Sequence, residues 1–263
     1  MIADAATQPG LLLDIDGVLF VGGEAIPGAV ETLVRLRQAS AGVRLLTNTT
    51  SRPRRELFDQ LIALGFDVAI EEILTPASMA LEYCREHGHE SVVLLVSDRL
   101  REDLEPLQET SDGERADAII LGDIGERFTP EVLDRAFRLM MDGAELVALQ
   151  HNRYWRRADG LALDVGAYSA ALEYASGKEA VVVGKPAPAF FLAAMADMGV
   201  EHAVMVGDDV EADVGGAMAA GLPGILVRTG KYRADALTAR VTPTAIVDSI
   251  VDVPELLARL PAA

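Results

Sequence analysis

The stretch Gly10-Leu11-Leu12-Leu13-Asp14-Ile15-Asp16-Gly17 decides the fold of this chain. Its apolar run has no polar alternation, which is typical of a strand buried on both faces of a parallel sheet. The run stops at a carboxylate, and Gly17 allows a sharp turn directly afterwards. We therefore expect a central strand that brings acidic side chains to one edge of a sheet.

Three later stretches have the same form, an apolar run that ends in polar residues. They are residues 43–48 (VRLLTN), 181–186 (VVVGKP) and 203–209 (AVMVGDD). In an open parallel α/β sheet the carboxyl ends of the strands form one edge, and ligands bind there. If the four strands share one sheet, six polar side chains meet at that edge: Asp14, Asp16, Thr47, Lys185, Asp208 and Asp209. Carboxylates for a hard cation, hydrogen-bond donors and one ammonium favour phosphoryl transfer.

These stretches resemble the four motifs of the haloacid dehalogenase-like superfamily. The matching segments are residues 14–19 (DIDGVL), 47–49 (TNT), 184–186 (GKP) and 207–213 (GDDVEAD). Their order and spacing are similar to those of the subfamily IIA phosphatases. Residues 160–166 (GLALDVG) and 229–232 (TGKY) are more similar still to the phospholysine phosphohistidine inorganic pyrophosphate phosphatases and their relatives. The resemblance covers residues 11–232 and implies a Rossmann-like, doubly wound parallel sheet core with an inserted α/β cap domain.

The length between the second and third motifs indicates a domain of its own. Roughly a hundred residues separate Pro76 from Val181, far more than an ordinary loop contains. We therefore expect a catalytic core over residues 1–76 and 181–263, and an α/β cap over residues 77–180. Strand and helix patterns alternate in both parts, as in other α/β folds.

The expected elements follow from the apolar periodicity. In the cap we expect helices at 79–87, 130–141 and 168–175, strands at 92–96, 118–121 and 146–149, and a solvated turn at 111–114. In the core we expect helices at 54–64, 187–198, 210–220 and 254–260, and strands at 73–74, 181–183, 203–206, 224–227 and 245–248.

The resemblance implies a role for each motif residue. Asp14 is expected to be the nucleophile that forms an aspartyl-phosphate. Asp16 is expected to act as general acid and then as general base. Asp14, the backbone carbonyl of Asp16 and the side chain of Asp208 are the expected ligands of a Mg²⁺ cofactor, whose preferred ligands are oxygens.

The remaining motif residues are expected to support this chemistry. Thr47 and Asn48 would donate hydrogen bonds to the phosphoryl oxygens, and Lys185 would neutralise charge on the phosphate and the nucleophile. Asp209 and Asp213 are expected to orient metal-bound waters, and direct contact with the metal stays open.

Composition limits the partners. The 263 residues carry a net charge of −18, so nucleic acid and anionic membrane surfaces are not expected partners. No apolar run approaches the ~20 residues of a membrane span. Cys84 is the single cysteine, which excludes an internal disulfide, and residues 1–9 lack a signal-peptide pattern. We therefore expect a cytoplasmic enzyme that acts on a small phosphorylated compound.

Several alternatives stay open at this level. A catalytically silent, metabolite-binding member of the fold and a phosphorylation-switched receiver-like protein share parts of the motif set. Arg153 and Tyr154 either line the substrate pocket or form an edge of the cap. The substrate, which could be a phosphate ester, a phosphoramidate or pyrophosphate, and the choice between monomer and homodimer are not encoded in a readable pattern.

Overall fold

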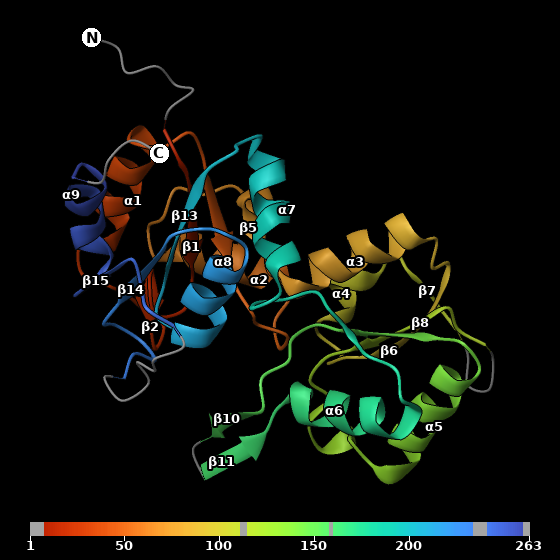
Figure 1. The fold of residues 1–263 in the computed structure, drawn as a ribbon. Coiled ribbons are helices and arrows are strands. Elements are labelled where there is room, and N and C mark those ends of the chain that lie inside the picture. Colours follow the sequence, from red (N-terminus) through yellow and green to blue (C-terminus); the bar gives the residue numbers. More distant parts are fainter. Residues whose placement is uncertain (1–7, 111–114, 158–159, 234–240, 260–263) are drawn as a thin grey trace. The chain divides into compact units, whose positions relative to one another are not determined.

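The computed structural model describes residues 8–110, 115–157, 160–233 and 241–259 (Figure 1). The chain divides into two compact units. Unit 1 comprises residues 1–47, 55–74 and 185–263, and unit 2 comprises residues 48–54 and 75–184. The expected turn at residues 111–114 lies outside the described residues.

Unit 1 is built on a six-stranded parallel sheet in the order β15-β14-β13-β1-β4-β5. The strands are β1 (Gly10–Asp14), β4 (Val43–Leu46), β5 (Ile73–Leu74), β13 (Ala203–Gly207), β14 (Gly224–Val227) and β15 (Ala245–Val247). Strand β1 lies between β4 and β13, and all five of its residues are buried. The prediction of a central strand buried on both faces is confirmed.

Helices cover both faces of this sheet. They are α1 (Ala29–Gln38), α2 (Arg54–Ala63), α7 (Pro188–Met198), the short α8 (Gly216–Ala219) and α9 (Val253–Leu257). Leu33 of α1, Leu57 of α2 and Val253 of α9 share one core with Leu11 and Leu13 of β1. Figure 1 shows α1 and α9 on one side of the sheet and α7 on the other. The predicted doubly wound α/β class is therefore confirmed. A short hairpin, β2 (Phe20–Val21) and β3 (Glu24–Ala25), follows the first motif.

One predicted strand belongs to a different sheet. We expected residues 181–183 to pair beside the other motif strands, but β12 (Val181–Val182) pairs with β9 (Glu145–Ala148) in unit 2. An apolar run shows that a strand is buried but not which neighbour it has, because both sheets offer buried positions. Lys185 is the first residue of the third segment of unit 1.

Unit 2 has a parallel five-stranded sheet in the order β12-β9-β8-β6-β7. Its other strands are β6 (Ser91–Leu95), β7 (Gln108–Glu109) and β8 (Ala118–Leu121). Helices α3 (Pro76–His87) and α4 (Arg101–Leu104) pack on one face, and α5 (Pro130–Met141) and α6 (Val165–Ser176) on the other. Threonine side chains begin two of these helices: Thr75 Oγ1 accepts from Ser78 N at 3.1 Å, and Thr129 Oγ1 from Val132 N.

Unit 2 also contains an antiparallel hairpin that the sequence did not predict. Its strands are β10 (Tyr154–Arg157) and β11 (Gly160–Leu163). Leu161 and Leu163 of β11 are both exposed, so the apolar residues of this strand do not mark a buried face from which alternation would predict it.

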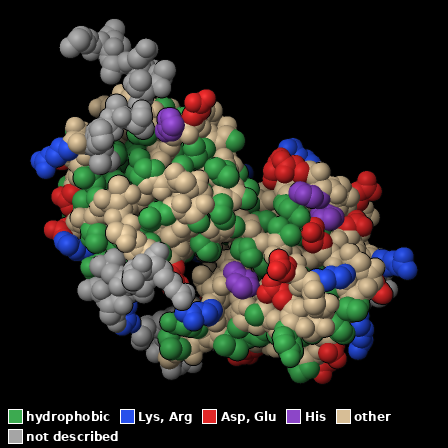
Figure 2. Space-filling model, in the orientation of Figure 1, with side chains coloured by type: hydrophobic (Ala, Val, Ile, Leu, Met, Phe, Trp, Pro, Cys, Tyr) green, Lys and Arg blue, Asp and Glu red, His purple; other side chains and the backbone are tan. Residues whose placement is uncertain are grey.

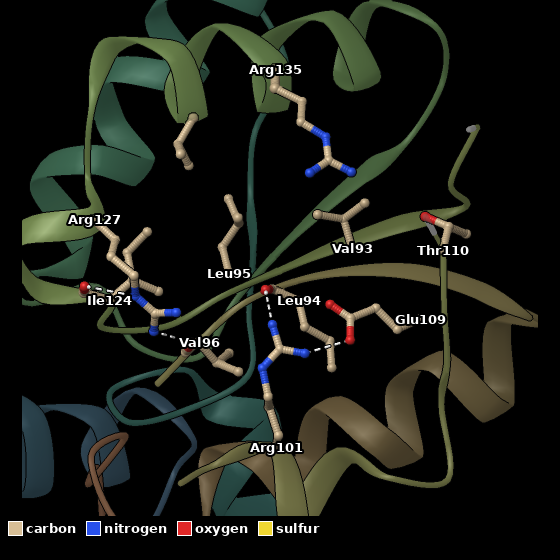
Figure 3. A pocket seen from close by; sticks show the side chains of 11 residues that line it. Val93, Leu94, Leu95, Val96, Arg101, Glu109, Thr110, Ile124, Arg127 and Arg135 are labelled. Carbon is tan, nitrogen blue, oxygen red and sulfur yellow. Dashed lines mark hydrogen bonds and ion pairs between the residues drawn. The ribbon is translucent and has the colours of Figure 1, made fainter. Parts of the chain in front are cut away.

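Arginines surround a pocket of about 260 Å³ beside β6 in unit 2 (Figure 3). Among the described residues, strand β7 pairs with Ser91 and Val92 on this edge of β6. Arg101 donates to the carbonyl of Leu94 at 3.4 Å, and Arg127 donates to the carbonyl of Val96 at 2.9 Å. These guanidiniums satisfy main-chain acceptors that a neighbouring strand would otherwise bind.

An apolar groove in the described part of unit 1 lies away from the polar ends of the strands. Its volume is about 650 Å³, and Leu192, Met195, Leu222 and Leu257 contribute to its lining. Pro9, Pro223 and Thr244, which precede β1, β14 and β15, also line it, so it lies at the amino ends of the strands. Figure 2 shows hydrophobic side chains gathered over much of unit 1 on the face drawn. Among the described residues, no helix is long and apolar enough to span a membrane.

Candidate active site

The polar residues of unit 1 meet where its parallel strands end. Asp14 closes β1, and the register places it beside Leu46, directly before Thr47. On the other side of β1, Leu13 pairs with Val206, so Asp208 also lies just past the end of its strand. The chain leaves β1 toward β4 and later returns to β13 on its other side, which makes this edge a topological switch point. The predicted grouping of Asp14, Thr47 and Asp208 at one edge follows from this topology.

Lys185 lies between two aspartates. Its Nζ is 2.5 Å from Asp14 Oδ1 and 2.6 Å from Asp213 Oδ1. All three side chains are buried, and Lys185 is only 2% exposed. A buried ammonium remains charged only when carboxylates compensate for its lost hydration. Burial lowers the pKa of Lys185, but the charges of Asp14 and Asp213 outweigh it and raise that pKa overall.

Asp208 uses its two oxygens differently. Its Oδ2 accepts a hydrogen bond from the main-chain N–H of Lys231 at 2.5 Å. Its Oδ1 is buried and is the one carboxylate oxygen without a hydrogen-bond partner among the buried side-chain atoms described. An unpartnered buried oxygen is costly unless a ligand satisfies it. Asp208 Oδ1 therefore has the chemistry expected of a cation ligand.

Asp213 and Asp209 hold the neighbouring turn. Asp213 Oδ2 accepts from Asp209 N at 3.0 Å, while its Oδ1 faces Lys185. Asp209 Oδ1 accepts from Glu211 N at 3.0 Å and from Ala212 N at 2.9 Å. Both oxygens of Asp213 thus have protein partners, and Asp209 acts as the N-cap of the following helix.

The helix expected at residues 210–220 has a different form. Val210–Gly215 is a π-helical turn, and only Gly216–Ala219 is α-helical. Val214 N donates to Asp209 O, five residues back, instead of four. The predicted helix is present, but its first part is π-helical. Apolar periodicity does not report a wide turn, and such turns are frequent at functional sites.

The cluster carries excess negative charge. Ligand oxygens of Asp14, Asp208 and Asp213 lie within 4.8 Å of one another. Two ammoniums interact with these three carboxylates: Lys185, and Lys231, whose pKa is lowered by burial but raised overall by the charges of the same acids. The carboxylates still outnumber the ammoniums. A divalent cation that prefers oxygen ligands matches both the donor set and this charge, so the residues fit Mg²⁺.

Burial also shifts the pKa values of the acids in the cluster. Burial raises the pKa of Asp14 well above its usual range; Lys185 lowers it, and the charges of Asp213 and Asp208 raise it further. Burial and the charge of Asp213 raise the pKa of Asp208 to about 6, against the lowering effect of the Lys231 N–H. Positive charge at this site would favour the ionised forms of both acids.

The roles of four predicted residues are less closely defined by the structure. Asp16 is half-buried and forms an isolated bridge with Phe20, two residues beyond the proposed nucleophile. Asn48 is the first residue of unit 2, so its expected contact with a phosphoryl group remains a prediction. Tyr154 is 55% exposed on β10, and the Arg153 guanidinium carbon lies 5.8 Å from the centre of its ring. Whether this pair lines the substrate pocket also stays a prediction.

Sequence reasoning gave no role to the segment after β14. Thr229 Oγ1 donates to the carbonyl of Gly17, and Lys231 N donates to Asp208, as described above. Gly17 and Gly230 have φ angles of +94° and +63°. The available signal was the TGKY motif, which follows a buried strand as the other motifs do.

Comparison with known proteins places this geometry in a family. A model described as haloacid dehalogenase-like hydrolase matches residues 11–108, and a HAD-hydrolase-like model matches residues 182–253. The human haloacid dehalogenase-like hydrolase domain-containing protein 2 is 45% identical over 226 residues, 85% of each chain. The human phospholysine phosphohistidine inorganic pyrophosphate phosphatase is 40% identical over 257 residues, 94% of this chain and 93% of the relative.

Solved structures agree with the sequence relatives. The p-nitrophenyl phosphatase from Archaeoglobus fulgidus has a TM-score of 0.86 and 26% identity, covering 95% of this chain and 99% of its own. A glycerol phosphate phosphatase from Mycobacterium tuberculosis, in complex with magnesium, has a TM-score of 0.81 and 29% identity. The match covers 98% of this chain and 80% of the phosphatase chain. The resemblance inferred from the motifs is confirmed, and this chain belongs to the haloacid dehalogenase-like hydrolase family.

Proposed function

We propose that this enzyme is a Mg²⁺-dependent phosphatase that hydrolyses a small phosphorylated compound through an aspartyl-phosphate on Asp14. The observation that carries the proposal is the buried cluster in which Lys185 contacts Asp14 and Asp208 Oδ1 has no partner. Two relatives whose names state a phosphatase activity, one by sequence and one by structure, support the reaction class.

In the first step a carboxylate oxygen of Asp14 attacks phosphorus. The bond between phosphorus and the leaving-group oxygen or nitrogen breaks, and Asp16 gives its proton to that leaving atom. The positive charge of Lys185 favours the ionised form of Asp14, against the effect of burial, and screens the negative charge that approaches it. The product of this step is the acyl phosphate of Asp14 and the free leaving group.

In the second step water attacks the phosphorus of the acyl phosphate. Asp16, now a carboxylate, takes a proton from that water, and the bond between phosphorus and the Asp14 oxygen breaks. Inorganic phosphate leaves, and Asp14 returns to its initial state. One pair of acids thus serves both steps without a net change in the enzyme.

The cation site would be formed by Asp14, the backbone carbonyl of Asp16 and Asp208. Bound Mg²⁺ supplies positive charge that stabilises the phosphoryl oxygens and aligns them with the nucleophile. Thr47 and Asn48 are the proposed hydrogen-bond donors to those oxygens. Asp209 and Asp213 act indirectly, by holding the π-turn and Lys185 in place.

The substrate class we propose is a phosphate ester, a phosphoramidate or pyrophosphate. The names of the relatives include phospholysine, phosphohistidine, pyrophosphate, p-nitrophenyl phosphate and glycerol phosphate. In all of these a phosphoryl group is bonded to an oxygen or nitrogen that becomes a better leaving group on protonation. This shared chemistry matches a nucleophile paired with a general acid.

A phosphate-release assay tests the proposal. The purified full chain is incubated with p-nitrophenyl phosphate, pyrophosphate and a phosphoramidate, first with Mg²⁺ and then after treatment with EDTA. We expect turnover of at least one substrate with Mg²⁺, loss of that turnover with EDTA, and recovery when Mg²⁺ is restored. Full activity in metal-free buffer would refute the cation site, and no turnover of any substrate would favour the silent metabolite-binding alternative.

A further inference from the structure

Residues 229–231 connect two loops that carry proposed cation ligands. This segment, the 229–231 strap, follows β14 in unit 1. At one end Thr229 donates its hydroxyl to the carbonyl of Gly17, in the turn that follows Asp14 and Asp16. At the other end the Lys231 N–H binds Asp208 Oδ2 at 2.5 Å. The strap thus joins the loop after β1 to the loop after β13.

Two glycines form a slot around Asp208 Oδ2. A Cβ atom added to Gly17 would lie 2.0 Å from this oxygen, and a Cβ added to Gly230 would also lie 2.0 Å from it. The Cβ added to Gly230 would also lie only 2.6 Å from the Cα of Gly17. The backbones of the two glycines therefore approach the carboxylate more closely than any other residue type would allow.

We propose that the 229–231 strap is a positioning element for cation binding, and this inference rests on the proposed function. The strap fixes Asp208 Oδ2 with a hydrogen bond and with the glycine slot. It thereby leaves the buried, unpartnered Oδ1 as the oxygen presented to Mg²⁺. Groups that orient a metal ligand through hydrogen bonds commonly contribute 10–100-fold to metal affinity.

A purely structural strap predicts a different result. If residues 229–231 only close the end of the sheet, disturbing them lowers stability and leaves the Mg²⁺ affinity of the folded protein unchanged. If they position Asp208, the same change weakens Mg²⁺ binding even where the protein remains folded. The dissociation constant for Mg²⁺, measured by calorimetry on the full chain without substrate, separates these outcomes.

The main test compares Gly230→Ala with Gly221→Ala. Both glycines have positive φ, +63° and +82°, so both variants carry the strain of a left-handed alanine. Only the methyl of Gly230→Ala meets Asp208, because nothing lies within 4 Å of the methyl of Gly221→Ala. We expect at least tenfold weaker Mg²⁺ binding by Gly230→Ala and a dissociation constant within twofold of wild type for Gly221→Ala.

A second set of three variants covers the case in which Gly230→Ala does not fold. Thr229→Val removes the hydroxyl that binds Gly17 and keeps the shape, and Thr229→Ser restores the hydroxyl. Thr244→Val is the matched control, because Thr244 Oγ1 also binds a main-chain group, Gly224 N at 3.2 Å, at the amino end of β14. We expect weaker Mg²⁺ binding in Thr229→Val alone among these three variants.

The outcomes separate this inference from the proposed function. If wild type binds Mg²⁺ and the folded Gly230→Ala and Thr229→Val variants bind it within twofold of wild type, the positioning role is refuted and the cation site stands. If wild type itself binds no Mg²⁺, the cation site is refuted and the strap has nothing to position.

Discussion

Lys185 is one of three lysines in a chain whose other cations are arginines. Its ammonium fits between Asp14 and Asp213, where each carboxylate offers one oxygen within 2.6 Å. A planar guanidinium spreads its donors over a wider fork, whereas an ammonium is a compact charge with three donors. The residue type thus matches a narrow site between two acids.

Replacing Lys185 with alanine should affect both activity and folding. We expect kcat to fall by roughly 10²–10³, the usual effect of removing one preorganised charge stabiliser. Two buried carboxylates would also lose their counter-ion, and breaking a buried pair costs about 3–5 kcal/mol. Phosphate release and urea unfolding measure the two effects. Lys178→Ala, in unit 2, is the control and should change neither by much.

The turn over Val210–Gly215 shows how a short element can position a site. Its N-cap, Asp209, accepts hydrogen bonds from the N–H groups of its second and third residues, and its fourth residue, Asp213, binds Lys185. The cap and the buried charge therefore depend on the same few residues.

Asp209→Ala should lower activity as well as stability. Loss of an N-cap costs about 1 kcal/mol, and here it also releases the turn that carries Asp213. We expect kcat to fall several-fold. Thr129→Ala removes a comparable cap from α5 of unit 2 and should lower only the free energy of unfolding. Equal kcat values for the two variants would contradict a positioning role for Asp209.

Helix α3 buries the single cysteine. Burial, with a smaller contribution from the charge of Glu145, raises the pKa of the Cys84 thiol to about 11 from an ordinary value of 9.0. In the unfolded chain the thiol ionises from pH 9 upward, whereas in the folded protein it stays protonated. The free energy of unfolding should therefore decrease as the pH rises from 9 through 11.

The expected decrease is at most about 2–3 kcal/mol, since one pKa unit corresponds to ~1.4 kcal/mol. Urea unfolding at a series of pH values measures it, and Cys84→Ala should flatten the slope in this range. A thiol reagent should label Cys84 only after unfolding. Rapid labelling of the native protein, or an unchanged slope in Cys84→Ala, would show that the thiol is not buried as described.

At the scale of the whole molecule, the sequence predicted the class of fold and the grouping of three candidate site residues. Buried parallel strands are continuous apolar runs, and each ends in its motif residue, so Asp14, Thr47 and Asp208 could be placed at one edge. The sheet that contains Val181–Val182 could not be predicted, because an apolar run does not specify its neighbour. The glycine slot around Asp208 was also missed, since it depends on close approach between remote segments.

The division of the chain leads to a prediction about specificity. All proposed catalytic residues except Asn48 belong to unit 1, so we expect unit 2 to affect substrate choice more than the chemical step. Tyr154→Ala should change kcat/KM for a phosphorylated peptide more than for p-nitrophenyl phosphate. Tyr174→Ala, which removes a 93% exposed tyrosine from α6, is the control. Equal losses for both substrates in Tyr154→Ala would contradict this division of roles.

The most direct test of the account is detection of the phosphorylated nucleophile. The enzyme is mixed with substrate and Mg²⁺, quenched in acid during turnover, digested and examined by mass spectrometry. The account predicts a phosphoryl group on the peptide that contains Asp14. With Asp14→Asn it predicts no phosphorylation of the corresponding peptide and no release of phosphate. A phosphoryl group on another residue, or near wild-type turnover by Asp14→Asn, would contradict it.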